Sequence, residues 1–171
     1  MPRISDSFDL DRVEWRRVTD LSNPDFKVDF EFSLLGYDMD CQRLDMLLRY
    51  GKGGGHCRRH RHVAATATLV LDGDQFVTDL LPDGTLSKTV HRTKGAYALS
   101  PADAHPHNEC GGEEGGTVLL SMHAREDGVL FEYFDDTMEN RWTLTIREYV
   151  DAWEKGAIYG SQAGRPTAAV Q

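Results

Sequence analysis

Short runs of strand-forming residues, separated by turn signals, recur along most of this chain. Each run is five to eight residues long and is β-branched, aromatic or alternating in character. The runs cover 30–35, 43–50, 66–72, 75–81, 88–92, 96–100, 117–123 and 129–134. Asp-Gly pairs at 72–73, 83–84 and 127–128 lie between runs, and such pairs are typical of hairpin turns. This pattern predicts an all-β sandwich or barrel.

One helix is expected near the end of the chain, over about 146–155. Thr145 and Glu148 have the spacing of a capping box, and Gly156 is a plausible residue to end the helix. Four apolar residues follow at helical spacing, namely Ile146, Tyr149, Val150 and Trp153. We expect this apolar face to pack on the outside of the sheet, and the tail at 161–171 to be flexible.

Length, charge and cysteine content favour a single domain, 1–171, in the cytoplasm. The chain has 171 residues, enough for one sizeable core. The net charge of -9 argues against a nucleic-acid partner, which needs a clustered positive surface. Neither an apolar run of about 20 residues nor a signal-peptide core is visible, so we expect no membrane partner. Three cysteines, Cys41, Cys57 and Cys110, suit a reducing compartment.

The segment GGGHCRRHRH, residues 53–62, indicates a metal site. His60 and His62 are two residues apart at the start of a strand, so their side chains share one face. His56 and His60 would suit a helix, but the preceding glycines and the following strand formers exclude one. A third ligand has two candidates, His105 and His107, which follow a strand and a proline turn.

Other charged and histidine residues have weaker interpretations. The basic cluster near the first histidines is favoured to be a solvated strand edge, with an anion anchor near a pocket mouth as the alternative. Its members are Lys52, Arg58, Arg59 and Arg61. His91 is expected at the surface, whereas His123 ends an apolar strand and could face a pocket.

The first histidine segment resembles the first motif of the cupin family, G-x5-H-x-H-x3,4-E-x6-G. Gly54, His60, His62 and Gly73 fall into register with this motif. Thr66 stands where the motif has its glutamate. The resemblance implies a jelly-roll barrel from about 43 to 134.

The segment around 95–107 resembles the second cupin motif, G-x5-P-x-G-x2-H-x3-N. Gly95 and Pro101 match, Asp103 replaces the second glycine, and the histidine position falls on Pro106. In cupins the motif histidines face the inside of the barrel and bind one metal. The resemblance therefore implies His60, His62 and His107 as metal ligands, with His105 as the alternative third ligand.

The departure at Thr66 bears on the chemistry. Three neutral imidazoles without an anionic ligand would leave a divalent metal its full charge, which favours an anionic bidentate substrate such as the enolate of a diketone. This arrangement resembles the three-histidine cupin dioxygenases, such as those acting on acetylacetone and dihydroxyacetophenone. Asp103 or Glu109 could still add a carboxylate.

The resemblance implies a non-haem Fe(II) dioxygenase that cleaves a C–C bond next to a carbonyl in a small diketone or hydroxyketone. His56 or Arg58 could orient the substrate, with Thr66 and His123 as further neighbours of the site. The alternatives are a zinc- or nickel-dependent hydrolase, isomerase or lyase, and a non-enzymatic cupin that binds a small molecule. Cupins of this size often pair through edge strands, so a homodimer is expected.

Overall fold

The computed structural model describes residues 13–20, 23 and 26–155, which fold into ten strands and one short helix. The strands are β1 (Arg16–Asp20), β2 (Val28–Asp38), β3 (Arg43–Tyr50), β4 (His60–His62), β5 (Ala65–Leu80), β6 (Leu86–Thr93), β7 (Tyr97–Ser100), β8 (His107–His123), β9 (Val129–Phe134) and β10 (Arg141–Thr145). The helix is α1 (Ile146–Glu154). The expected all-β fold with a C-terminal helix is confirmed, although β1 and β10 were not predicted.

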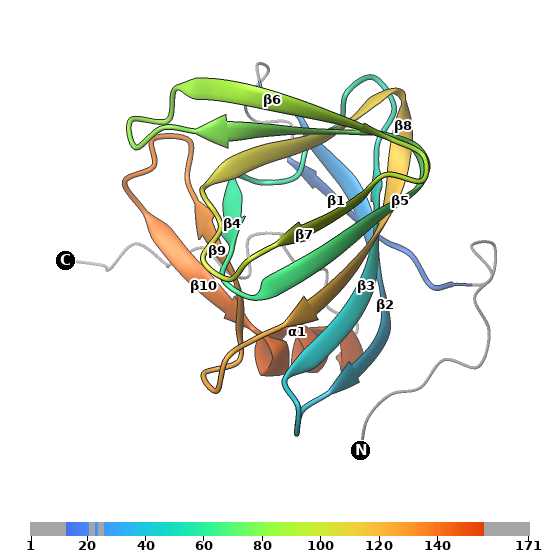
Figure 1. Ribbon diagram of the computed structural model, residues 1–171, viewed down its shortest axis with the longest axis vertical. Helices are drawn as coiled ribbons and strands as arrows, with labels where there is room; N and C mark the ends of the chain where they lie inside the picture. Colours follow the sequence, from blue (N-terminus) through green and yellow to red (C-terminus); the bar gives the residue numbers. More distant parts are fainter. Residues whose placement is uncertain (1–12, 21–22, 24–25, 156–171) are drawn as a thin grey trace.

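The strands form one sheet that curls around a shared interior (Figure 1). The order is β1-β2-β3-β8-β4-β9-β10, and β5 pairs with β8 as well as with β6 and β7. Within the described residues, the pairings between these strands are antiparallel, as in a jelly roll. β8 is therefore the central strand, in contact with β3, β4 and β5.

Alternating burial along the strands builds the core. In β5 the first six residues alternate between half-buried and buried, so one face turns inward. The inward residues of β3 and β8 meet there, and Leu44 pairs with Met122 with both side chains fully buried. Burial of such apolar side chains stabilises the fold by roughly 1.5–3 kcal/mol each.

The prediction of a hairpin at 72–74 is wrong, because β5 runs continuously through this segment. Gly73 has φ +64° and lies between two register shifts in the pairing with β8. A Cβ on Gly116 of β8 would lie 2.0 Å from the carbonyl oxygen of Asp74, so the two backbones approach closely here. The Asp-Gly pair thus bends the strand rather than reversing it. The second pair does form a turn, in which Gly84 donates to the carbonyl of Leu81.

α1 begins at the expected capping box. Thr145 accepts a hydrogen bond from the backbone of Glu148, whose carboxylate accepts one from the backbone of Thr145. The helix does not pack on the outer face as expected. Tyr149 and Trp153 contact Phe32 of the core, so α1 covers one end of the barrel (Figure 1). In the described part of the chain, no helix is long and apolar enough to cross a membrane. Gly156 and the tail at 161–171 lie outside the described residues.

Candidate metal centre

β4 and β8 lie side by side and place four buried side chains together. In β4, His60 and His62 share the buried face, because alternate residues of a strand point the same way, and Arg61 lies on the other face. β8 begins at His107, which pairs with His60 across the two strands. Glu109 follows two residues later and therefore lies on the same face as His107.

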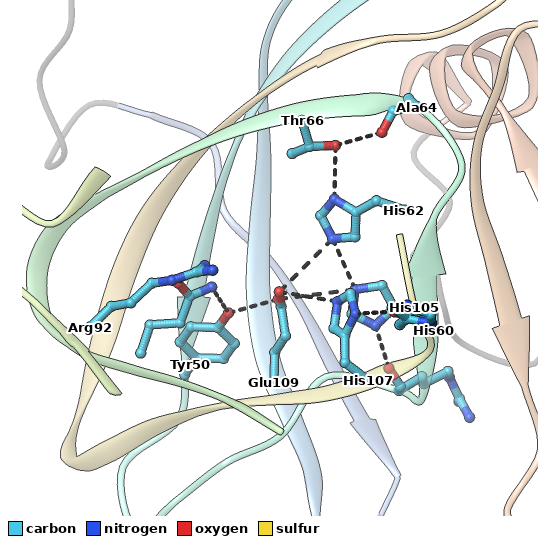
Figure 2. A network of polar contacts seen from close by, with 11 residues as sticks. Tyr50, His60, His62, Ala64, Thr66, Arg92, His105, His107 and Glu109 are labelled. Atoms are coloured by element: carbon cyan, nitrogen blue, oxygen red, sulfur yellow. Dashed lines mark hydrogen bonds and ion pairs between the residues drawn. The ribbon is translucent and has the colours of Figure 1, made fainter. Parts of the chain in front are cut away.

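The four side chains converge on one point (Figure 2). One nitrogen or carboxylate oxygen from each lies within 4.8 Å of the other three. Nε2 of His60 and Nε2 of His62 are 3.2 Å apart, and Nε2 of His107 is 3.4 Å from Oε1 of Glu109. All four residues are at most 7% exposed. The structure thus brings together the three histidines expected from the sequence, with a carboxylate beside them.

Hydrogen bonds to the outer nitrogens fix the orientation of all three rings. Nδ1 of His60 lies 2.7 Å from the carbonyl oxygen of Arg58, and Nδ1 of His107 lies 2.7 Å from that of His105. A carbonyl oxygen only accepts, so each Nδ1 carries the proton and donates it. Each Nε2 then presents its lone pair to the shared point, which is the arrangement that a metal ion requires.

Thr66 performs the same role for His62. Its hydroxyl donates to the carbonyl oxygen of Ala64 at 3.0 Å, so its single hydrogen is used. The hydroxyl oxygen must then accept from Nδ1–H of His62, 2.8 Å away. The residue that replaces the motif glutamate therefore orients the second histidine.

Glu109 changes the expected charge of the centre. The sequence favours three neutral imidazoles without an anionic ligand and leaves open a carboxylate from Asp103 or Glu109. Glu109 belongs to the buried group, whereas Asp103 is an exposed partner of Arg61 and Arg125. The carboxylate that the first motif lacks is thus supplied by the facing strand, and the expectation of an uncompensated site is corrected.

Burial and mutual contact set the protonation of the group. Burial lowers the pKa of His60 to about 4, with the neighbouring His107 adding to the effect, and burial also lowers the pKa of His62 well below its ordinary value. Burial works in the opposite direction on Glu109, but contact with the histidines holds its pKa well below its ordinary value. The pKa of His107 is raised by Glu109 against the effect of burial.

These residues fit a divalent metal ion. Nε2 of His107 is buried and, among the described residues, makes only the 3.4 Å ion-pair contact with Oε1 of Glu109, without a well-aligned hydrogen bond. Under the tautomers fixed above, the lone pairs of His60 and His62 also face each other without a proton between them. Three imidazoles and a carboxylate are ligands that suit iron, zinc and nickel alike. A cation at the shared point would satisfy all of these groups at once.

An apolar cavity of about 40 Å³ adjoins the group. His60 and Glu109 form part of its wall, together with Cys57 and Arg58. The rest of the lining is apolar or aromatic, namely Phe30, Phe32, Met46, Leu48, Leu120, Phe131, Tyr133 and Tyr149. A polar centre beside an apolar wall is the usual make-up of a small-molecule site.

The other four histidines lie outside the buried group. His105 is exposed and contributes its carbonyl rather than its ring. His56 is half-buried and its ring packs on Phe26, with centroids 4.8 Å apart, outside the buried group. His123 is exposed, so it does not face the pocket. His91 is exposed as expected and stacks on Phe76.

The basic cluster divides into two parts. Lys52 pairs with Glu114 at the surface, and Arg61 pairs with Glu132 and Asp103. Arg58, in contrast, is buried, pairs with Asp20 and lines the cavity. The interpretation as a solvated strand edge is therefore wrong for Arg58, which belongs to the pocket.

Comparisons with known proteins support the fold. The sequence matches no family model and no curated protein. Among solved structures, an acetylacetone dioxygenase from Acinetobacter johnsonii is similar at a TM-score of 0.60 and 12% identity, covering 90% of this chain and 92% of that one. A candidate acetylacetone dioxygenase from Methylibium petroleiphilum PM1 has a TM-score of 0.59 and 15% identity, with coverages of 88% and 96%.

A cupin-like protein from Thermotoga maritima is also similar, with a TM-score of 0.52, 15% identity, and coverages of 77% and 90%. Identities this low establish the fold and not the activity. The chain has the cupin fold. Fold and site together define a cupin barrel with a buried group of three histidines and one glutamate that could bind a divalent metal.

Proposed function

We propose that this chain is a mononuclear metal-dependent dioxygenase that cleaves a C–C bond next to a carbonyl in a small diketone or hydroxyketone. The observation that carries the proposal is the convergence of three Nε2 lone pairs and one carboxylate beside an apolar cavity. The fold that the chain shares with the acetylacetone dioxygenase from Acinetobacter johnsonii supports the same reaction class. His60, His62, His107 and Glu109 would hold the metal, with Fe(II) as the expected ion.

The protein's own residues prepare this chemistry. When bound, the metal would act as a Lewis acid and, as iron, supply the redox chemistry. The low pKa of His60 and His62 keeps both rings neutral and ready to bind at neutral pH. The cavity wall is mostly apolar and aromatic, and the small volume suits a substrate of only a few heavy atoms. Arg58 lines the same cavity and is placed to orient the polar end of that substrate.

Glu109 also favours a second candidate, a zinc- or nickel-dependent hydrolase, isomerase or lyase. The carboxylate offsets part of the metal's charge, which weakens the attraction for an anionic bidentate substrate. Histidine and carboxylate ligands with an open position are also the make-up of catalytic zinc sites. Bound metal and oxygen consumption separate the two candidates.

The first test is the metal content of the wild type and of two histidine variants. Protein purified without oxygen should contain near-stoichiometric iron and consume oxygen with a small diketone. His107→Ala removes one imidazole and should lose the metal. His105→Ala keeps the backbone carbonyl that orients His107, so it should retain the metal and serves as the matched control.

Each result points in one direction. Zinc or nickel alone, without oxygen uptake, would favour the second candidate. Full metal occupancy in His107→Ala would show that the buried group is not the metal site. The homodimer and the cytoplasmic location expected from the sequence stay predictions.

A further inference from the structure

A line of hydrogen bonds leads from β6 across the interior to the carboxylate of Glu109 (Figure 2). Nη1 of Arg92 donates to Oε1 of Gln75 at 3.1 Å, and Nε2 of Gln75 donates to the hydroxyl oxygen of Tyr50 at 3.1 Å. The hydroxyl of Tyr50 donates to Oε2 of Glu109 at 2.9 Å. Tyr50, Gln75 and Glu109 are at most 4% exposed, so water does not compete for these bonds.

The direction of every bond in this line is determined by Arg92. A guanidinium only donates, so the amide oxygen of Gln75 must face it. The amide nitrogen of Gln75 then faces Tyr50 and occupies the phenol oxygen as a donor. The hydroxyl hydrogen of Tyr50 is left with one acceptor, Oε2 of Glu109.

We propose that Tyr50, Gln75 and Arg92 are positioning residues that hold Glu109 as a one-oxygen ligand, an inference that rests on the proposed function. Oε2 accepts from the hydroxyl of Tyr50 and lies 4.0 Å from Nε2 of His60. Oε1 lies nearer to the other two histidines, 3.4 Å from Nε2 of His107 and 3.9 Å from Nε2 of His62. A carboxylate can bind a metal through one or two oxygens. The bond from Tyr50 uses a lone pair of Oε2 and draws negative charge toward the hydroxyl, so it favours metal binding through Oε1 alone.

The consequence concerns the positions open to substrate. Three imidazoles and one carboxylate oxygen would use four positions of a metal ion, so a six-coordinate ion would keep two. A small bidentate substrate needs both. If Glu109 bound through two oxygens, one of these positions would be lost, so the line from Arg92 keeps the site open for a bidentate ligand.

Two substitutions disrupt the line without changing any of the four ligands. Gln75→Glu presents acceptors to both Arg92 and Tyr50, so the hydroxyl hydrogen of Tyr50 turns away from Glu109. Tyr50→Phe removes the donor altogether. Thr78→Val is the matched control, because Thr78 lies on the same strand as Gln75 but its hydroxyl bonds to that of Thr89 on the exposed side.

The experiment loads each protein with Co(II), whose visible absorption weakens as its coordination number rises, and then titrates acetylacetonate as a bidentate probe. Gln75→Glu and Tyr50→Phe should show the same altered Co(II) spectrum and bind the probe about tenfold or more weakly than the wild type. Thr78→Val should match the wild type in both measurements. Melting curves confirm that each variant is folded.

The outcomes separate this inference from the proposed function. Unchanged Co(II) spectra and probe affinity in both folded variants would overturn the positioning role while leaving the metal site intact. A wild type that binds no Co(II) would overturn the metal site itself. If Gln75→Glu does not fold, Tyr50→Phe alone decides, because it leaves the bond between Gln75 and Arg92 in place.

Discussion

At the scale of single residues, the hydroxyl of Thr66 connects the backbone to the metal centre. It donates to the carbonyl of Ala64 and accepts from Nδ1–H of His62, so it fixes both the tautomer and the angle of that ring. The partners that orient metal-binding histidines are often as important as the ligands themselves. Thr66 also fills the position where the cupin motif has a ligand, which makes it informative to change.

Thr66→Val should therefore weaken metal binding without removing a ligand. The substitution leaves Nδ1–H of His62 buried without an acceptor, and we expect the Kd for the metal to rise about 10- to 100-fold. Competition with a chromophoric chelator measures this change. Thr66→Ser keeps the hydroxyl and should restore most of the affinity, whereas equal affinity in Thr66→Val and the wild type would exclude the orienting role.

At the scale of elements, the long pairing of β5 with β8 depends on glycine where the two backbones come closest. A Cβ on Gly116 would lie 2.0 Å from the carbonyl oxygen of Asp74, which is fixed in the strand. A Cβ on Gly112 would instead meet the Asp74 carboxylate at 3.0 Å, and that side chain can move. The same pairing continues to His107, so it also sets the position of the metal centre.

Gly116→Ala should lower the free energy of unfolding by about 2 kcal/mol or more, because the two strands must separate to accept the methyl group. Gly112→Ala is the matched control on the same strand and should cost less. Urea unfolding of both variants measures the difference. Equal losses in the two variants would mean that the close approach at Gly116 has no energetic consequence.

At the scale of the whole molecule, burial of the histidine group links stability to pH. The pKa of His60 is lowered to about 4 in the folded protein, so between this value and about 6.5 the unfolded chain binds more protons. Stability must then fall as the pH falls through that window. His62 acts in the same direction, whereas the raised pKa of His107 acts in the opposite one.

The metal-free protein should therefore be less stable at pH 5 than at pH 7.5, with His60 alone contributing a loss of about 2 kcal/mol. Urea unfolding in the presence of a chelator at the two pH values measures the loss. His60→Gln removes the titrating ring next to His62, His107 and Glu109 and should flatten the profile. A profile as steep in His60→Gln as in the wild type would contradict the assignment.

Much of the fold could be read from local patterns. The observed β3 and β9 have the bounds expected for 43–50 and 129–134, and α1 begins at the expected capping box. These elements follow from periodicity and capping, which act over a few residues. The hairpin at 72–74 failed because the Asp-Gly pair has two uses, and the backbone of β8 beside Gly73 selects the bend.

The candidate site, like the fold, could be predicted only in part from local patterns. A spacing of two residues on a strand was enough to place His60 and His62 on one face. The same spacing relates His107 to Glu109, although Glu109 was expected only as one of two possible carboxylates. Tyr50, Gln75 and Arg92 come from three different strands, and no pattern in the chain relates them to one another. Only the pairing of distant strands brings them to Glu109.

The sequence by itself determined the all-β class, the terminal helix and the shared face of His60 and His62, because alternation and capping are local properties of the backbone. The tertiary structure decided which carboxylate joins the histidines. Thr66 and Glu109 lie on different strands, and the register of β4 against β8 directs Glu109 to the shared point. Register depends on contacts across the whole sheet, which no single segment encodes.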